Sequence, residues 1–411
     1  MPTKEDRLKI IKRVRTLVLQ HHFNVGNIDY AAWSREVEHR TPSLIAADDQ
    51  IFETDVQALL SDLKSSHTNF IRSDAQPTKP QHSIGATLRP VIRDGAKRWM
   101  FLDVYDESPA ARGGIHPGDM LMSLNGCELV PPAEPVFAFG DAHRLAIGNL
   151  NGNGRREITV NIPARKGLKS RPPLVEPKSV SYCMVKPGVG LLKIPFFSGA
   201  FGIRFSKLLD SAMNDLKLQG CNRLIVDLRG CLGGSLGFAR LVSYFCPGRI
   251  PIGYDITRKR LRSGYHVDEL PRVAMPATRL GLTTCLLRFA VQDKSLMLLT
   301  QGLGEQPFHG RMAVLINEWT NSAGEMAAQF AKNTRLATVV GCKTMGNVLG
   351  STMFKVGNGY SLYLPIFGWY NPDGSQPEGS GVEPDVPIDI DPADLAHGED
   401  AQLNKAISLT T

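Results

Sequence analysis

Ser322 stands where a strand-like run gives way to a helical one, a position at which several enzyme folds carry a nucleophile. Residues 312–316 are apolar, a polar turn follows, and residues 326–331 have a helical pattern. A serine on such a corner has its hydroxyl lifted off the sheet, beside the first free N–H groups of the helix, which can bind an oxyanion. Serine is also a common helix N-cap. Taken alone, this stretch favours the N-cap over the nucleophile.

A glycine pair marks a second loop that could bind an anion. The apolar run 222–229 leads into Gly-Cys-Leu-Gly-Gly, ending in Gly233 and Gly234, and a helix is expected from Ser235. Glycines between a strand and a helix let backbone N–H groups approach a ligand closely. The Lys-Ser/Thr pair of a phosphate-binding P-loop is missing, so an oxyanion fits this loop better than a phosphate.

Ser66 and His67 follow directly after a helical segment and form a candidate base. Imidazole titrates near neutral pH, which suits proton transfer. A lone histidine in a loop is more often a surface or hydrogen-bonded residue than a catalyst, and that alternative stays open at this point.

Composition sets broad limits on the function. The chain has 411 residues, enough for two or three domains, and its net charge of +7 is spread along the sequence. No cluster of Lys and Arg with interleaved aromatics occurs, which argues against a nucleic-acid partner. A mildly basic surface could attract carboxylates, such as peptide C-termini.

Cysteine usage and the N-terminus bear on the compartment. The seven cysteines are scattered without a CxxC pair, which predicts free thiols in a reducing compartment and no metal site. The first residues are charged and lack a signal-peptide core, and the apolar stretch 280–299 contains Arg288, Asp293 and Lys294. These features predict no membrane insertion and a cytoplasmic protein, or a periplasmic or secreted one if a signal peptide has been removed.

The pattern of periodicity divides the chain into four parts. Residues 4–64 have helical spacing, the stretch from 82 to about 166 has short strands and turns, and strands and helices alternate after 178. Linkers are expected at 71–81 and 167–178. The predicted parts are a helical segment (1–76), a β-rich domain (77–168), an α/β core (169–398) and a C-terminal tail (399–411).

The β-rich part resembles a PDZ domain of the bacterial protease type. The resemblance lies in Ser-Pro-Ala at 108–110 followed by Gly-Ile-His-Pro-Gly-Asp at 114–119, and it closes in Asn-Gly at 125–126. It implies a domain that adds a peptide as an extra strand and holds its terminal carboxylate in a loop. That carboxylate loop would be Ser83, Ile84, Gly85 and Ala86. The alternative is a module that only packs against the core as a lid.

Taken in order, the motifs resemble the C-terminal processing (tail-specific) peptidases and the tricorn protease core, a family of serine peptidases. The resemblance implies an α/β fold with a crotonase/ClpP-like core, an N-terminal helical segment and an inserted PDZ domain. It implies that Ser322 is the nucleophile. It also implies that N–H groups of Gly233 or Gly234 and of Ala323 form the oxyanion hole.

The family has two ways of activating its serine, and the sequence favours one. The processing-peptidase branch uses a lysine in a Gly-Lys pair, but here the pair is Gly346-Asn347, and asparagine cannot act as a base. The tricorn-like branch uses a Ser-His pair and a glutamate before Gly-Val-x-Pro-Asp. The resemblance therefore implies His67 as general base, with Ser66 and Glu378 orienting it. Lys343 is not expected to contribute to activity, and no metal or other cofactor is expected.

These expectations amount to a serine endopeptidase that acts on peptide or protein substrates, with the PDZ domain capturing C-termini. One alternative is a non-catalytic peptide- or ligand-binding protein of the same fold. A crotonase-like acyl-CoA enzyme is another, although it leaves the PDZ motif and Ser66-His67 unexplained. The sequence leaves the oligomeric state open.

Overall fold

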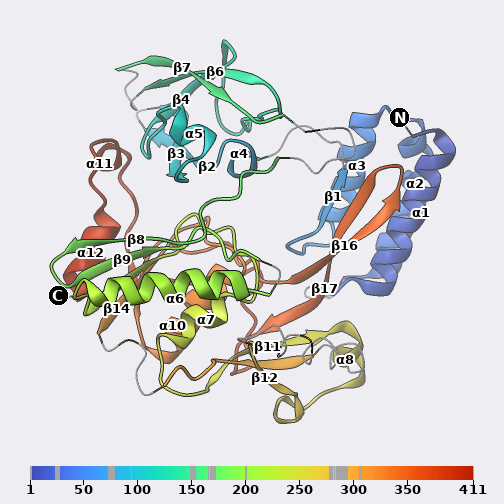
Figure 1. The fold of residues 1–411 in the computed structure, drawn as a ribbon. Helices are drawn as coiled ribbons and strands as arrows, with labels where there is room; N and C mark the ends of the chain where they lie inside the picture. The colour runs from blue at the N-terminus through green and yellow to red at the C-terminus, as the bar shows by residue number, and fades with distance from the viewer. Residues whose placement is uncertain are drawn as a thin grey trace. The chain divides into compact units, whose positions relative to one another are not determined.

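The computed structural model describes residues 2–23, 28–72, 79–93, 95–148, 154–164, 166, 173–199, 201–276, 281, 283, 295–304, 308 and 310–410. The chain forms two compact units (Figure 1). Unit 1 comprises Met1–Ala75, Gly248–Gly302 and Met345–Gly381. Unit 2 comprises Gln76–Pro247, Leu303–Thr344 and Val382–Thr411.

Unit 1 packs three N-terminal helices on a six-stranded sheet. The helices are α1 (Lys4–His21), α2 (Tyr30–Ala46) and α3 (Asp49–Ser61), which confirms the helical pattern expected over 4–64. Thr3, Asp29 and Asp48 cap their N-termini. The strands run in the order β1 (Asn69–Arg72), β17 (Tyr360–Tyr370), β11 (Pro251–Thr257), β13 (Leu296–Leu299) and β12 (Arg272–Ala274), with β16 (Gly350–Gly357) on β17. The short helices α8 (Arg258–Ser263) and η1 (Val267–Glu269) complete the described elements.

Strands β16 and β17 form a hairpin around residues 357–359. They pair antiparallel, and the turn between them contains Asn358 and Gly359, whose φ angles are 46° and 79°. Glycine and asparagine tolerate positive φ better than other residues do, so this turn composition is compatible with a tight hairpin.

Unit 2 begins with the β-rich module, residues 79–164. It contains α4 (Pro80–Ser83), β2 (Ala86–Arg93), β3 (Ala96–Val104), α5 (Pro109–Arg112), β4 (Met120–Leu124), β5 (Cys127–Glu128), β6 (Ala142–Gly148) and β7 (Arg156–Asn161). The strands pair in the order β2-β3-β4-β6-β7. Ser108 caps α5 as the Ser-Pro-Ala motif suggests, and Asn125 and Gly126 form the turn between β4 and β5.

The rest of unit 2 is a mostly parallel α/β core. Its sheet has the order β18 (Val386–Pro387), β15 (Thr338–Gly341), β14 (Arg311–Ile316), β10 (Arg223–Asp227), β9 (Val189–Lys193) and β8 (Ser181–Lys186). Only β8 among these pairs antiparallel. The helices are α6 (Ile203–Leu218), α7 (Phe238–Ser243), α10 (Ala323–Thr334), α11 (Pro392–Ala396) and α12 (Ala401–Thr410). Because parallel strands are buried on both faces, β10 and β14 have continuous apolar runs.

The segment 399–411, expected as a separate tail, belongs to this core. Its helix α12 buries Ala406 and Ile407 in the same apolar cluster as Ala313 and Leu315 of β14. The sequence reading missed this because a single amphipathic helix after an irregular stretch gives no sign of where its apolar face packs.

Several expectations fall partly or wholly outside the described residues. These are most of the two linkers (73–78 and 167–172), most of the apolar stretch 280–299, and Cys285. Cys127, Cys183, Cys221, Cys231 and Cys342 are free thiols. Over the residues that the structure describes, no helix has the length and apolar character needed to cross a bilayer.

Replacing Phe52 should destabilise unit 1 strongly, because its ring is fully buried and packs edge-on against Phe70 and Tyr360, each with a centroid separation of 6.0 Å. Phe52→Ala is expected to lower the free energy of unfolding by about 3–5 kcal/mol in urea titrations. The neighbouring Ile51→Ala, at a side chain that is 51% exposed, should cost less than about 1 kcal/mol. Equal losses in the two variants would show that this helix face does not form the core described here.

Candidate active site

Ser322 lies on the corner between β14 and α10, and its backbone is strained. Its φ and ψ are 52° and −114°, a region that residues other than glycine rarely occupy. The buried carboxylate of Glu325 holds the corner by accepting the Ser322 N–H at 3.0 Å and the Thr344 hydroxyl at 2.5 Å. Glu325 therefore supports the backbone of the corner, in the capping or packing role that its position suggests.

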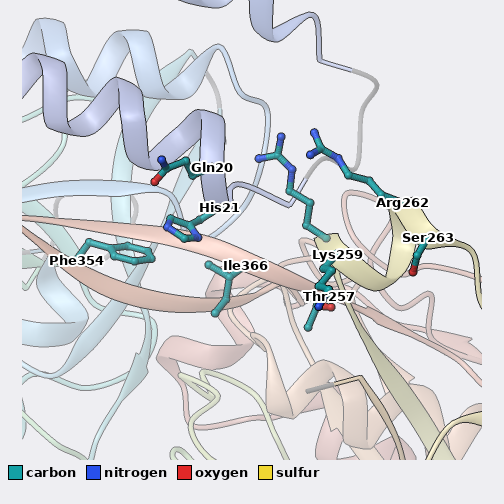
Figure 2. Close-up of a pocket in the computed structure, with 9 residues that line it drawn as sticks. Gln20, His21, Thr257, Lys259, Arg262, Ser263, Phe354 and Ile366 are labelled. Atoms are coloured by element: carbon teal, nitrogen blue, oxygen red, sulfur yellow. The ribbon is translucent and has the colours of Figure 1, made fainter. Parts of the chain in front are cut away.

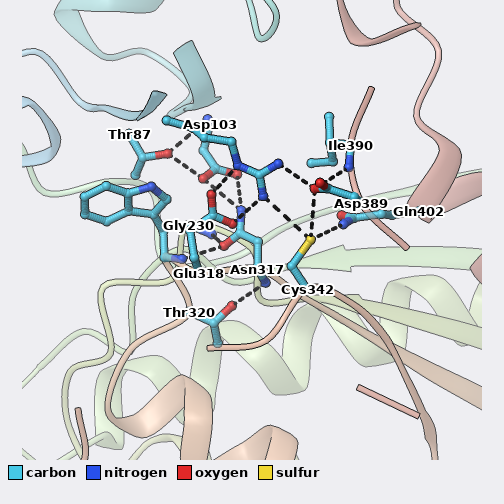
Figure 3. A network of polar contacts seen from close by, with 12 residues as sticks. Thr87, Asp103, Gly230, Asn317, Glu318, Thr320, Cys342, Asp389, Ile390 and Gln402 are labelled. Carbon is cyan, nitrogen blue, oxygen red and sulfur yellow. Dashed lines mark hydrogen bonds and ion pairs between the residues drawn. The ribbon is translucent and has the colours of Figure 1, made fainter. Parts of the chain in front are cut away.

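Asn317, at the end of β14, fastens the corner to two other segments (Figure 3). Its side-chain oxygen accepts the N–H groups of Gly230 and Trp319, each at 3.0 Å, and its amide donates to a carboxylate oxygen of Asp103 at 3.1 Å. Asp103 belongs to β3 of the β-rich module, and its burial raises the pKa of its carboxyl group. Asn317 was not among the predicted site residues. The only signal for it in the sequence was an amide directly after the apolar run 312–316.

Arg89 of the module makes a second connection to the same turn. It donates to Glu318 at 2.7 Å and to Asp389 at 2.6 Å (Figure 3). These contacts, with the apolar packing of Met100 and Leu102 near Trp319, attach the module to the residues that precede Ser322.

Gly233 lies directly against Ser322. A Cβ atom at Gly233 would sit 2.8 Å from the Ser322 Cβ, and the residue has φ of 80°, so only glycine fits. Among the described residues, no protein acceptor is paired with the N–H of Gly234 or of Ala323. Both N–H groups are thus available to a bound oxyanion.

Cys231 packs beneath this loop. Burial raises the pKa of the Cys231 thiol to about 12, and a hydrogen bond from the Gly233 backbone opposes the rise. The thiol is therefore neutral at physiological pH. Asp227 and Arg229 form an ion pair with an N···O distance of 2.8 Å, and Arg229 also contacts Asp400 at 2.8 Å.

In unit 1 the structure brings the adjacent Ser66 and His67 together with Glu378, which is 312 residues after Ser66 in the sequence. One oxygen of Glu378 accepts the Ser66 N–H at 2.8 Å, and the other accepts the Ser66 hydroxyl at 3.0 Å. The Ser66 Oγ lies 2.9 Å from Nδ1 of His67. The relay Glu378–Ser66–His67 is thus continuous.

Counting protons along this relay assigns the histidine tautomer. The Ser66 hydroxyl has one proton, which it donates to Glu378, so its oxygen must accept from Nδ1–H of His67. A neutral His67 then has its lone pair on Nε2, the atom that would act as a base. Burial lowers the pKa of His67, and the charge of Glu378 opposes that shift.

Residues 346–348 support the turn that carries Glu378. This segment includes the Gly346-Asn347 pair, which stands where the lysine branch has Gly-Lys. The Val348 N–H donates to Glu378 at 2.9 Å. Gly346 has φ of 81°, and a Cβ there would come within 2.6 Å of the Gly381 nitrogen. This segment therefore holds the carboxylate. Lys343 forms an exposed ion pair with Glu383 at 2.6 Å.

His22 braces the Ser66-His67 turn, a contact that the sequence analysis did not anticipate. Its Nε2 lies 2.9 Å from the Ser65 hydroxyl and its Nδ1 2.8 Å from the Tyr30 hydroxyl. Ser65 in turn lies 2.8 Å from the Thr68 hydroxyl. Burial and the nearby Arg258 lower the pKa of His22 to about 4.

The expected carboxylate loop of the module is closed in this structure. Ser83, Ile84, Gly85 and Ala86 are buried, and the N–H groups of Ile84 and Gly85 both donate to the Pro80 carbonyl at 3.0 Å. Capture of a peptide carboxylate by these two groups requires those bonds to open.

The predicted site residues thus form two groups, one in each unit. Ser66, His67 and Glu378 lie together in unit 1, and Ser322, Gly233, Gly234 and Ala323 lie in unit 2.

Residues 188–388 match peptidase family S41. The chain carries a domain of peptidase family S41. The family domain and the relatives of the whole chain indicate a serine-type peptidase activity. The chain is 23% identical over 393 residues to a CtpA-like serine protease of Staphylococcus epidermidis, and the match covers 92% of this chain and 70% of that protein.

A tricorn protease homologue of Streptomyces coelicolor is 25% identical over 402 residues, covering 92% of this chain but 30% of that protein. Among solved structures, an S41 protease from Bacteroides fragilis matches with a TM-score of 0.58 and 18% identity over 96% of both chains. The photosystem II D1 C-terminal processing protease matches with a TM-score of 0.55 and 14% identity over 93% of both. These structural similarities confirm the predicted fold class of this chain, a mixed α/β fold of the S41 peptidase type.

The low pKa of His22 predicts that the folded chain loses stability in acid. The unfolded state binds a proton near pH 6.5 while the folded state does so only near 4, so the free energy of unfolding should fall by about 2–3 kcal/mol as the pH decreases across that window. His22→Gln, which cannot titrate, should flatten this dependence in urea titrations at several pH values. The matched control, His39→Gln at an exposed side chain, should leave it unchanged. An identical pH dependence in wild type and His22→Gln would contradict the assignment.

Proposed function

We propose that the chain is a serine endopeptidase in which Ser322 attacks the peptide carbonyl and His67 is the general base. Ser66 and Glu378 orient the imidazole, and N–H groups of Ala323 and of Gly233 or Gly234 bind the oxyanion. The observation that carries the proposal is the Glu378–Ser66–His67 relay, because it leaves Nε2 of His67 as the proton acceptor.

The reaction follows from these roles. Nε2 of His67 takes the proton of the Ser322 hydroxyl as its oxygen bonds to the carbonyl carbon, and the carbonyl oxygen becomes an oxyanion held by backbone N–H groups. The imidazolium then gives its proton to the departing amine, which breaks the peptide bond and leaves an acyl-enzyme. Water repeats the sequence with His67 as base and releases the new carboxylate. The proposal requires His67 of unit 1 and Ser322 of unit 2 to meet during catalysis.

Two features of the chain support Ser322 over the N-cap alternative. Its strained φ and ψ serve no purpose in a simple cap, since capping residues normally have extended backbone. Gly233 is also pressed against it, with unpaired N–H groups nearby at Gly234 and Ala323 among the described residues. A binding protein without catalysis has no need of this arrangement together with the His67 relay.

We further propose that the β-rich module captures the C-termini of peptide or protein substrates, as PDZ domains do. Its connections to the turn before Ser322, through Asp103 and Arg89, support a role next to the substrate. Opening of the Pro80 bonds would free the N–H groups of Ile84 and Gly85 for the carboxylate.

Cleavage of a random peptide library, read by mass spectrometry, tests the proposed roles. Ser322→Ala and His67→Ala are each expected to lower kcat by about 10⁴-fold or more while remaining folded. Lys343→Ala, the control for the lysine branch, should retain wild-type activity because its ammonium group is paired with Glu383 at the surface. Loss of activity in Lys343→Ala, or its survival in His67→Ala, would refute the histidine mechanism.

The pH profile offers an independent check. His67 must be neutral to act, and its pKa is lowered from the ordinary value of 6.5, so kcat/KM should begin to fall with decreasing pH only below about 6.5. Glu378→Gln removes the charge that raises this pKa. The midpoint should therefore move to still lower pH, and kcat should drop by about 10²-fold. A midpoint that moves upward would contradict the relay.

A further inference from the structure

Unit 1 contains a cavity with a strongly basic rim that the proposed chemistry does not use. Its volume is about 600 Å³, within the range of small-molecule sites. Arg258, Lys259 and Arg262 of α8 line one side, and His21, Phe354 and Ile366 line the other. Figure 2 shows Lys259 and Arg262 across from the His21 end of α1 and from the strand residues Phe354 and Ile366.

Among the described residues, no carboxylate pairs with these three cations. The described lining of the cavity includes no Asp or Glu. Within the part of the chain that the structure describes, Arg258, Lys259 and Arg262 also form no ion pair. Arg258 instead donates to the Val18 carbonyl at 3.3 Å and lies over the Tyr30 ring at 4.9 Å. Three positive charges at one rim attract anions, most strongly at low salt.

The effect of this charge is visible on its neighbours. Burial lowers the pKa of Arg258, the neighbouring Tyr30 opposes that shift, and the charge of Arg262 adds to it. Arg258 in turn helps to lower the pKa of His22. The two guanidinium groups therefore repel each other, and a bound anion would relieve that repulsion.

The opposite wall is apolar and partly aromatic. His21 stacks on Phe354 with a centroid separation of 5.2 Å and an interplanar angle of 19°, and Ile366 lies nearby in the lining. A ligand that fits the whole cavity thus needs an anionic end and an apolar or aromatic body.

We propose that this basic pocket binds a phosphorylated small molecule with two or more phosphoryl groups on an apolar or aromatic body, the class to which nucleoside diphosphates belong. One phosphoryl group carries about 1.5 to 2 negative charges at pH 7, so two of them match three cations better than a single carboxylate does. Guanidinium groups also bind phosphate oxygens in a bidentate manner. The body of the ligand would lie against Phe354 and Ile366.

The pocket adjoins the support of the Ser66-His67 turn. His22 follows the lining residue His21 directly and contacts both Tyr30 and Ser65, and Tyr30 also lies under Arg258. A ligand that neutralises Arg258 should therefore stabilise unit 1, whether or not the chain is cutting peptide.

Isothermal titration calorimetry on the full chain tests this proposal at low and high salt. The probes are ADP, pyrophosphate and a hexapeptide with acidic residues. ADP is expected to bind with a submillimolar Kd, pyrophosphate more weakly because it lacks the apolar body, and both should weaken as salt screens the charges. A rise in Tm with ADP should accompany binding.

Variants locate the site. Arg262→Gln and Lys259→Gln, at exposed side chains that should not affect folding, are each expected to weaken ADP binding about tenfold or more. Lys355→Gln is the matched control, because Lys355 is exposed on the same strand as Phe354 but its side chain points to the other face. It should bind ADP within twofold of wild type.

Three results would overturn the proposal. They are no binding of ADP or pyrophosphate at about 5 mM in low salt, ADP binding that is unchanged in both Arg262→Gln and Lys259→Gln, or tighter binding of the acidic peptide than of ADP. Because the readout is binding and not cleavage, failure here is distinct from failure of the peptidase mechanism.

Discussion

One carboxylate organises the Ser66-His67 turn of unit 1. Glu378 accepts hydrogen bonds from the backbone and hydroxyl of Ser66 and from the backbone of Val348, at 2.8, 3.0 and 2.9 Å. These three donors come from two distant segments, so the carboxylate sets both the position of the Ser66-His67 turn and the direction of the Ser66 proton. Two other residues of unit 1 support this contact. Gly346 lets the Glu378 turn approach, and His22 braces the turn from the other side through Ser65.

Ser322, the proposed nucleophile, is held by different contacts. The Ser322 backbone occupies an unfavourable conformation, which costs on the order of 1–3 kcal/mol and persists only where the surroundings hold it. The buried Glu325 carboxylate and the Asn317 amide provide that support through the N–H groups of Ser322, Trp319 and Gly230. The same amide reaches Asp103 of the β-rich module. The Ser322 corner, the glycine loop and the module thus share one buried polar cluster, in which loss of one member leaves the others unsatisfied.

Much of this organisation could be predicted from the sequence. The helices of residues 4–64, the hairpin at 357–359 and the strand-to-helix corner at Ser322 follow from local periodicity and turn chemistry. The resemblance to the C-terminal processing and tricorn peptidases predicted that Ser66, His67 and Glu378 act together. The contacts that support the Ser322 corner could not be predicted from the sequence, because they pair residues far apart along the chain. Asn317 and Asp103 are 214 residues apart, and Arg89 and Glu318 are 229 apart. Nor does sequence show that the N–H groups of Ile84 and Gly85 are taken by Pro80, or that the last helix packs into the core.

The most direct test of the central claim is nitrogen NMR of the chain labelled with ¹⁵N-histidine, following His67 by comparison with a His67→Gln variant. The relay through Ser66 and Glu378 predicts a neutral ring protonated on Nδ1, with a bare Nε2, that gains its second proton only below pH 6.5. In Glu378→Gln this preference for the Nδ1–H form should weaken. A His67 ring protonated on Nε2 at neutral pH, or one whose tautomer ignores Glu378, would contradict the account.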